Sequence, residues 1–237
     1  MHNDISMETP MDKNPVIAYY DSIAAHYDNA AAEVADEQLE DLDEAREQIS
    51  TLLAGHRILE LGCGSGAWTE VLAETAESIV ATDASAAMLD LARMHGGDLD
   101  NVEYRLLDAL NLMTDPLPDD LGMGDDKFTA VFMGGLWAHL TRKQQDDLLQ
   151  SLKKRLGKDV LLVLFDDNYV EGESAVTVRT DLLGNTHEFQ LDADGKQHEL
   201  VKNYPTDSAL RKRVGVAGRE IRVARWEFYW VLTCRLK

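Results

Sequence analysis

Short apolar runs alternate with helical spacings through the first two thirds of the chain. The apolar runs predict strands at residues 57–61, 78–82, 102–107, 128–133 and 159–165. Helical spacing predicts helices at residues 67–76, 85–94 and 141–156. Strands that alternate with helices form βαβ units, and right-handed crossovers assemble these units into a parallel sheet covered on both faces. The pattern therefore predicts an α/β fold with a doubly wound sheet.

Other patterns mark the two ends of the chain. Residues 15–53 have helical spacing, with apolar side chains on one face and acidic side chains on the other. Residues 175–180, 186–191 and 198–202 alternate like half-buried strands, which predicts a small antiparallel β insertion. Pro205 is expected to open a helix that runs to Val214. Residues 220–224 and 226–236 then predict a C-terminal antiparallel hairpin, which brings the main sheet to seven strands.

A glycine-rich turn between the first strand and the next helix is the sharpest local signal. It reads Glu60-Leu61-Gly62-Cys63-Gly64-Ser65-Gly66. Glycines allow positive φ and a close approach of the backbone to a ligand, and the start of the following helix favours a carboxylate or phosphate. No lysine follows, so a phosphate-gripping P-loop is excluded. Ala67 still permits the dinucleotide fingerprint GxGxx(G/A).

Carboxylates end the next two predicted strands. Asp83 lies 17 residues after Gly66, at the tip of the second strand, where a carboxylate can accept both hydroxyl protons of a ribose. Asp108 ends the third strand at the same edge of the sheet. Together with Glu60, these carboxylates are expected to surround the glycine turn.

Four segments in this order resemble the motifs of the class I methyltransferases that use S-adenosylmethionine (SAM). ILELGCGSGAWTEVLA is similar to their first motif, VATDASAAMLDLA to the segment after it, LLDAL to the adenine-side motif and FTAVFMGGLWAHL to the fourth-strand motif. The resemblance covers residues 19–165 and is to the small-molecule, ubiquinone/menaquinone-type branch. It implies a Rossmann-like fold, SAM as the cofactor, and methyl transfer by in-line displacement to an O, N or S atom of a small organic metabolite.

Matching positions in the resembling family imply a role for each cofactor-binding residue. Glu60 and the backbone of Gly62, Gly64 and Gly66 would hold the methionine part of SAM, and Asp83 would bind the ribose hydroxyls. Ala84 and Met88 would flank the adenine, Asp108 and the Ala109 N–H would bind its polar edge, and Met133 would lie beside the sulfonium. Met88 equally fits plain core packing.

The segment YYDSIAAHYD, residues 19–28, resembles the family's N-terminal lid. Tyr20 and Tyr27 would close over the cofactor and exclude water, or they would only anchor the lid to the core. His139 lies six residues past Met133, at a position that faces the acceptor in the resembling family. As a catalytic candidate it is a general base; the alternatives are a substrate positioner and a structural residue.

Asp166-Asp167-Asn168 resembles the Asp-Asn of metal-dependent catechol-type methyltransferases. Such a site also needs a carboxylate at the end of the fourth strand, where this chain has Met133-Gly134-Gly135. We therefore expect no metal. The chain also lacks the motifs of amino methylation on adenine or glutamine and of cytosine C5 methylation, which favours a small organic acceptor.

Composition narrows the partners further. The chain has 237 residues, with 23 Lys+Arg against 43 Asp+Glu, and a formal charge of −20 disfavours nucleic acid as a partner. The longest apolar run, residues 160–165, is far shorter than a membrane span. Cys63 and Cys234 show no zinc or disulfide spacing. Residues 1–12 hold no secretion signal, so a cytoplasmic protein with a small-molecule substrate is expected.

The sequence also suggests a domain organisation. Residues 1–12 are expected to be disordered, residues 13–54 to form a helical lid, and residues 55–237 to form the SAM-binding domain, with residues 169–204 as a cap over the acceptor. Four polar cap residues are candidates either for substrate contact or for solvent exposure, namely Arg179, His187, His198 and Tyr204. A nicotinamide-dependent oxidoreductase and a non-catalytic SAM-binding module remain alternatives.

Overall fold

The computed structural model describes residues 14–27, 36–113 and 127–237. Two expectations lie wholly or partly outside the described residues. They are the disorder of residues 1–12, and residues 28–35 of the N-terminal helix.

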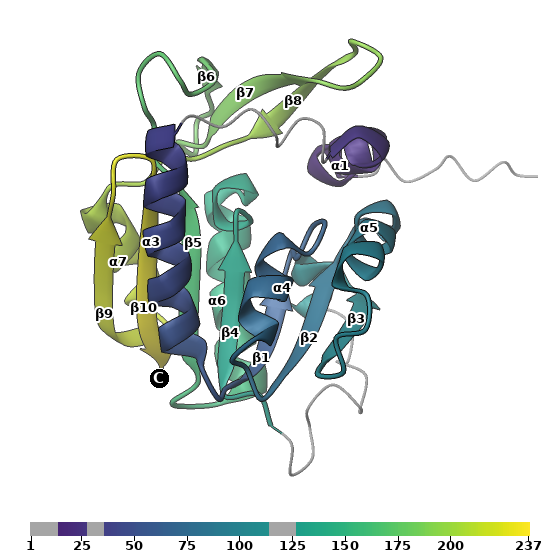
Figure 1. Ribbon diagram of the computed structural model, residues 1–237. Helices are drawn as coiled ribbons and strands as arrows, with labels where there is room; N and C mark the ends of the chain where they lie inside the picture. The colour runs from purple at the N-terminus through teal and green to yellow at the C-terminus, as the bar shows by residue number, and fades with distance from the viewer. Residues whose placement is uncertain (1–13, 28–35, 114–126) are drawn as a thin grey trace, which may run out of the picture.

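Seven strands form one sheet in the order β3-β2-β1-β4-β5-β10-β9 (Figure 1). Their bounds are β1 Arg57–Leu61, β2 Ser78–Asp83, β3 Val102–Leu106, β4 Ala130–Gly134, β5 Leu161–Asp167, β9 Gly218–Arg225 and β10 Tyr229–Leu236. The first five strands are parallel, and β10 runs antiparallel to both β5 and β9. The doubly wound, mostly parallel sheet with a C-terminal antiparallel hairpin is confirmed.

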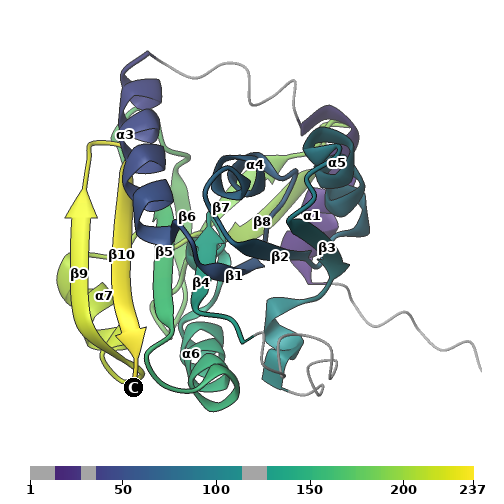
Figure 2. The same cartoon turned by 60° about the horizontal axis from the view of Figure 1, so that its bottom comes forward.

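Helices cover both faces of the sheet (Figures 1 and 2). Helices α3 (Asp36–Leu53), α4 (Ala67–Ala73) and α5 (Ala86–Gly96) lie on one face, and α6 (Arg142–Leu156) and α7 (Asp207–Val214) lie on the other. Successive side chains of β1 point to opposite faces. Ile58 therefore belongs to the buried cluster of α3, α4 and α5, and Leu59 belongs to that of α6 and α7.

The N-terminal region is not one continuous α-helix over its described part. Helix α1 (Pro15–Ile23) begins after Asn14, whose side chain accepts a hydrogen bond from the Val16 N–H. It ends at Ile23, and a 3₁₀ turn, η1 (Ala24–His26), follows. The apolar spacing is compatible with both kinds of helix, so the sequence did not reveal the change.

The predicted β insertion forms a three-stranded antiparallel sheet of β6 (Thr177–Thr180), β7 (Thr186–Leu191) and β8 (Gln197–Val201). In Figure 1 it lies at the top, beyond the carboxyl ends of the parallel strands, on the same side as α1. The rings of Tyr19 in α1 and His198 in β8 meet edge to face with centroids 5.5 Å apart. The insertion is thus in contact with the N-terminal helix.

One predicted helix start is wrong. Helix α7 begins at Asp207, and Pro205 lies before it. Thr206 is the N-cap, since its hydroxyl accepts a hydrogen bond from the Ala209 N–H, and that capping bond fixes the start. Among the helices that the structure describes, none combines the length and the apolar character needed to cross a membrane.

Candidate active site

Two glycine turns meet where the sheet topology reverses. Strand β1 lies between β2 and β4, so the chain leaves β1 and β4 toward opposite edges of the sheet. Gly62 to Gly66 follow β1, while Gly134 is the last residue of β4 and Gly135 follows it. In open α/β sheets, ligands bind at such a switch point, outside the carboxyl ends of the strands.

A cavity of about 940 Å³ opens at this point. Ten of the thirteen predicted site residues line it: Tyr20, Tyr27, Gly62, Gly64, Asp83, Ala84, Met88, Asp108, Ala109 and His139. Its volume is typical of a site for a small ligand or cofactor. We call it the first cavity.

Asp83 joins the ends of two loops at the wall of this cavity. Its Oδ2 accepts a hydrogen bond from the Gly64 N–H at 2.9 Å, and its Oδ1 accepts one from the Ser85 N–H at 2.8 Å. Burial raises the pKa of Asp83, while these backbone donors act in the opposite direction. A carboxylate oxygen has more than one lone pair, so Asp83 can still accept hydrogen bonds from a ligand.

The glycine turn has the shape of a ligand cradle. Gly62 has φ +73° and Gly64 has φ +57°, a region that favours glycine. A Cβ added at Gly64 or at Gly135 would meet no protein atom within 4 Å, and both residues line the first cavity. Side chains there would therefore occupy ligand space. This open backbone, with the carboxylate of Asp83 beside it, fits a nucleoside such as that of SAM.

Three of the predicted cofactor residues are buried, namely Glu60, Gly66 and Met133. They are not among the described residues that line the first cavity. The Thr69 hydroxyl donates to Glu60 Oε2 at 2.7 Å, and burial raises the pKa of Glu60 to about 7. A Cβ at Gly66 would lie 3.2 Å from the Ala92 Cα, so glycine there lets α4 pack against α5. The cofactor roles of all three residues remain predictions.

The wall of the first cavity also combines apolar and polar groups. Met88 is almost fully buried yet lines the cavity, so core packing and ligand contact are compatible at this position. Asp108 Oδ1 accepts a hydrogen bond from the Leu110 N–H at 2.9 Å. Leu107 and Ala109 line the wall beside it.

Helix α1 is bound to the cavity rim at two points. The Ser85 hydroxyl donates to Asp21 Oδ1 at 2.5 Å, next to the Asp83 loop. The Tyr20 hydroxyl lies 3.3 Å from His139 Nε2, and the Tyr20 and Tyr27 rings are 6.3 Å apart between centroids. The two tyrosines therefore come together in spite of the 3₁₀ turn between them.

His139 has a defined tautomer in this arrangement. Its Nδ1 lies 2.8 Å from the Val201 carbonyl oxygen. Since a carbonyl only accepts, Nδ1 carries the proton and Nε2 accepts from Tyr20. Burial lowers the pKa of His139 to about 3, and the nearby positive charge of Lys202 makes a smaller contribution in the same direction. The imidazole is therefore neutral near pH 7.

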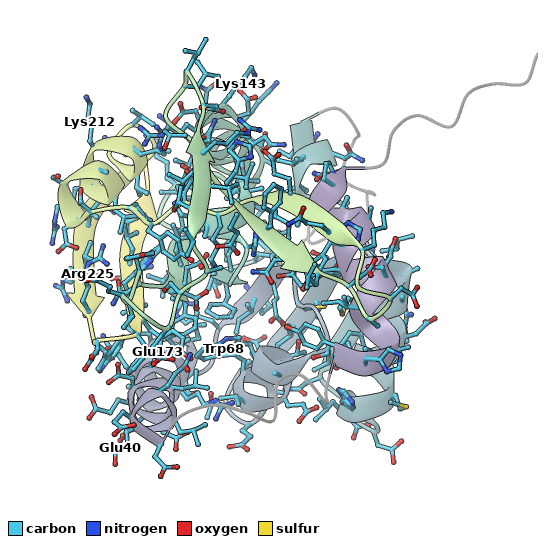
Figure 3. The ribbon with its side chains drawn as sticks, turned by 90° about the horizontal axis from the view of Figure 1, so that it is seen from above. Glu40, Trp68, Lys143, Glu173, Lys212 and Arg225 are labelled. Carbon is cyan, nitrogen blue, oxygen red and sulfur yellow. The ribbon has the colours of Figure 1, made fainter. Side chains whose placement is uncertain are left out.

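Several cavity residues were missed from the sequence. Trp68 lines the first cavity and also contacts Phe165, with ring centroids 4.8 Å apart. Leu42 and Arg46 of α3 and Tyr229 of β10 also line it. These residues come from elements far apart in the chain, and no local spacing indicates that they share a wall. Figure 3 looks down on this region and labels Trp68.

A second cavity of about 560 Å³ lies between α1, the carboxyl end of β5 and the insertion. Three residues line both cavities, namely Tyr20, Tyr27 and His139. Polar side chains from several elements complete the wall of the second cavity, among them Asp167, Glu173, Glu188, Lys202 and Tyr204. The two cavities therefore adjoin at these shared residues.

A buried lysine binds the Asp166-Asp167 pair that resembled a metal motif. Lys202 Nζ lies 3.2 Å from Asp166 Oδ1 and 2.6 Å from Asp167 Oδ2. Burial alone would lower the pKa of Lys202, but the two carboxylates hold it well above its usual value. Asp166 Oδ2 also accepts from the Ala138 N–H at 2.8 Å, which fixes the segment that carries His139.

Within the described ranges, no three His, Cys, Asp or Glu side chains form a metal-binding group.

The polar residues of the insertion divide into two groups. Arg179 pairs with Glu199 and contacts His187, and His198 pairs with Asp192 at 2.8 Å. The predicted residues of this group are not among the described residues that line either cavity; they are Arg179, His187 and His198. Tyr204 alone of the four lines the second cavity, where its hydroxyl lies 3.3 Å from Glu188 Oε2.

Comparison with known proteins agrees with this geometry. Residues 58–159 match the family described as Methyltransferase domain. A demethylmenaquinone methyltransferase of Clavibacter sepedonicus is 35% identical over 103 residues, which are 43% of this chain and 38% of that protein. A ubiquinone biosynthesis O-methyltransferase of Bordetella avium is 31% identical over 70 residues, 29% of each protein. The chain thus matches only about a third of the length of these curated relatives.

Solved structures share the fold over nearly the whole chain. The DhpI-SAM-HEP complex is 24% identical with a TM-score of 0.70, covering 93% of this chain and 96% of that chain. The CcbJ methyltransferase of Streptomyces caelestis is 21% identical with a TM-score of 0.64, covering 92% and 98%. At these identities the likeness concerns the fold.

The match of residues 58–159 to a methyltransferase domain family, together with the sheet order and the glycine turn, supports the resemblance to class I SAM-dependent methyltransferases that the motifs predicted. SAM, the cofactor that the motifs predicted, is also named in a solved structure that shares the fold, the DhpI-SAM-HEP complex. The family matched over residues 58–159 is a methyltransferase family, which favours the methyltransferase prediction over the oxidoreductase alternative that Ala67 had left open.

Proposed function

We propose that this protein transfers the methyl group of SAM to an O, N or S atom of a small organic molecule. The observation that carries the proposal is the junction of the two cavities at Tyr20, Tyr27 and His139. A cofactor in the first cavity and an acceptor in the second would meet there. Residues 13–54 would act as the lid and residues 169–204 as the cap, as predicted from the sequence.

The chain's own residues have separate proposed roles. Asp83 and the backbone of Gly62 and Gly64 would hold the cofactor, and Met88, Asp108 and Ala109 would surround its base. When bound, SAM supplies an electrophilic methyl group on a sulfonium. The Tyr20 and Tyr27 rings would exclude water and offer their faces to that cation. Much of the acceleration would then come from alignment in a dry site.

His139 is better suited to positioning than to proton removal. Its pKa of about 3 makes the imidazole a weak base. Its Nε2 can accept a hydrogen bond from Tyr20 or, in its place, from an acceptor group in the junction. The quinone-type acceptors in the names of the curated relatives do not settle the acceptor here, since those matches cover only part of either chain.

An acceptor screen tests the proposed function. Purified protein is incubated with SAM and pools of small alcohols, phenols, thiols and amines, and S-adenosylhomocysteine (SAH) is quantified by mass spectrometry. We expect SAH to form above the background with at least one pool. SAM binding without turnover in any pool would favour the non-catalytic alternative. A protein that fails to bind SAM would contradict the proposal outright.

A further inference from the structure

We propose that the methyl acceptor is a small organic amine, which binds in the second cavity as its ammonium form. This inference rests on the proposed function and names the substrate class of the same site. It is drawn from the charges and rings of the cavity wall.

Carboxylates outnumber available cations in that wall. Asp167, Glu173 and Glu188 line the second cavity, and Lys202 is the only lysine or arginine among its described lining residues. Lys202 is already held by Asp166 and Asp167. An anionic acceptor would therefore meet an excess of negative charge and a lysine whose charge is already balanced.

Glu188 is the carboxylate that most needs a cation. Its side chain belongs to a residue with only 5% exposure, on strand β7 of the insertion. Its described hydrogen-bond donors are the Gln190 amide at 2.9 Å and the Tyr204 hydroxyl at 3.3 Å. Both donors are neutral, and a buried carboxylate is costly without an opposite charge. An ammonium group in the cavity would supply that charge and further hydrogen bonds.

Aromatic rings complete a site suited to a cation. Tyr19, Tyr20, Tyr27 and Tyr204 all line the second cavity. Ring faces attract ammonium groups within about 6 Å of the centroid. Lys202 Nζ lies 5.9 Å from the centroid of the Tyr204 ring, so one of these rings already faces an ammonium group. Carboxylates and tyrosine rings together favour an amine over a neutral, largely apolar acceptor.

The chemistry balances without another reactant. The bound ammonium first releases one proton to water, which leaves a lone pair on nitrogen. That pair forms the new N–C bond as the C–S bond of SAM breaks, and the bonding pair of C–S stays on sulfur. The products are a methylated ammonium and SAH.

Binding of three matched probes tests the proposal. The probes are 2-phenylethylammonium, 2-phenylethanol and phenylacetate, which share a phenyl ring and differ in charge. Each is titrated into the SAH-loaded protein by calorimetry near pH 7. We expect the ammonium probe to bind at least about tenfold more tightly than the other two.

Glu188→Gln should weaken the binding of the ammonium probe about tenfold and leave the alcohol probe unchanged, because it removes charge while keeping the shape. Glu199→Gln is the matched control, since Glu199 lies in the same small sheet but outside the described lining of the cavity. Thermal unfolding checks that both variants fold. Should Glu188→Gln not fold, the order of the three probes on the parent protein still decides.

The outcomes separate this inference from the proposed function. Failure of SAH to bind would contradict the proposed function. Three results, each with SAH bound, would overturn the amine proposal alone. The ammonium probe does not bind, phenylacetate or phenylethanol binds equally well, or Glu188→Gln binds the ammonium probe like the parent.

Discussion

Asp83 connects the sequence motif to the proposed chemistry at the scale of a single residue. Its two oxygens hold the Gly64 and Ser85 backbone, and the same carboxylate faces the first cavity. The strand-end position of Asp83 could be predicted from the sequence. The two backbone bonds could not, because they depend on the φ angles of the glycine turn.

Replacing Asp83 by alanine should weaken SAM binding by about 2 kcal/mol, or roughly 30-fold, because charge-assisted hydrogen bonds to the ribose are lost. Calorimetric titration with SAM measures the change. Asp90→Ala, on the exposed side of α5 where Asp90 pairs with Arg93, is the control and should bind SAM like the parent. Equal affinity of Asp83→Ala and the parent would show that the ribose binds elsewhere.

Glu60 makes stability depend on pH. Burial raises its pKa in the folded protein to about 7 from an ordinary value of 4.5. Between pH 4.5 and pH 7 the folded state holds a proton on Glu60 that the unfolded state has lost. The contribution of protonated Glu60 to the free energy of unfolding is therefore fully present below about pH 4.5 and is lost as the pH rises through about 7. Above pH 7 the buried carboxylate is charged and destabilising.

Glu60→Gln should therefore be more stable than the parent at pH 8, by on the order of 3 kcal/mol, with a smaller difference at pH 5. Glutamine keeps an oxygen for the Thr69 hydroxyl. Urea unfolding at the two pH values measures the difference, and Glu70→Gln on the exposed side of α4 serves as control. If the unfolding free energies of Glu60→Gln and the parent differ by the same amount at both pH values, the assigned pKa shift is wrong.

At the scale of elements, α1 connects three parts of the molecule. It reaches the Asp83 loop through Asp21, the His139 segment through Tyr20, and the insertion through Tyr19. The acidic face of helix α3 also makes contacts within the protein, since Asp41 accepts a hydrogen bond from the Phe228 N–H and Glu44 accepts one from the Trp226 indole. Both helices thus contact loops at the site edge of the sheet.

Tyr20→Phe should release SAH about three- to tenfold faster, because the hydrogen bond that joins α1 to His139 is lost while the ring is kept. Trp68 lines the first cavity, so stopped-flow tryptophan fluorescence can follow the release. Tyr19→Phe is the matched control in the same helix. Equal release rates for Tyr20→Phe and the parent would show that α1 does not retain the ligand through this contact.

The sequence predicted elements better than it predicted their ends and partners. Apolar runs located the central strands β1, β4 and β5 because burial on both faces leaves a clear pattern. The start of α7 was misplaced at Pro205 because the capping bond of Thr206 is local geometry. The ion pairs of Lys202 with Asp166 and Asp167 join positions more than thirty residues apart. Such long-range pairing leaves no periodic signal in the chain.

At the scale of the whole molecule, charge is the dominant property. A formal charge of −20 destabilises the compact state through self-repulsion. Salt screens this repulsion, because the Debye length falls from about 30 Å at 10 mM to about 8 Å at 150 mM. We therefore expect the melting temperature to rise over this range. Sodium and potassium chloride at equal ionic strength should act alike, and a constant or falling melting temperature would contradict this expectation.

The central claim is that the first cavity binds the cofactor with Asp83 on its ribose and its sulfur at the junction of the two cavities. A crystal structure of the protein with SAH tests it most directly. We predict both ribose hydroxyls within hydrogen-bond distance of Asp83, the adenine beside Met88 and Asp108, and the sulfur facing Tyr20, Tyr27 and His139. SAH bound elsewhere, or in this cavity with its sulfur turned away from those three residues, would contradict the account.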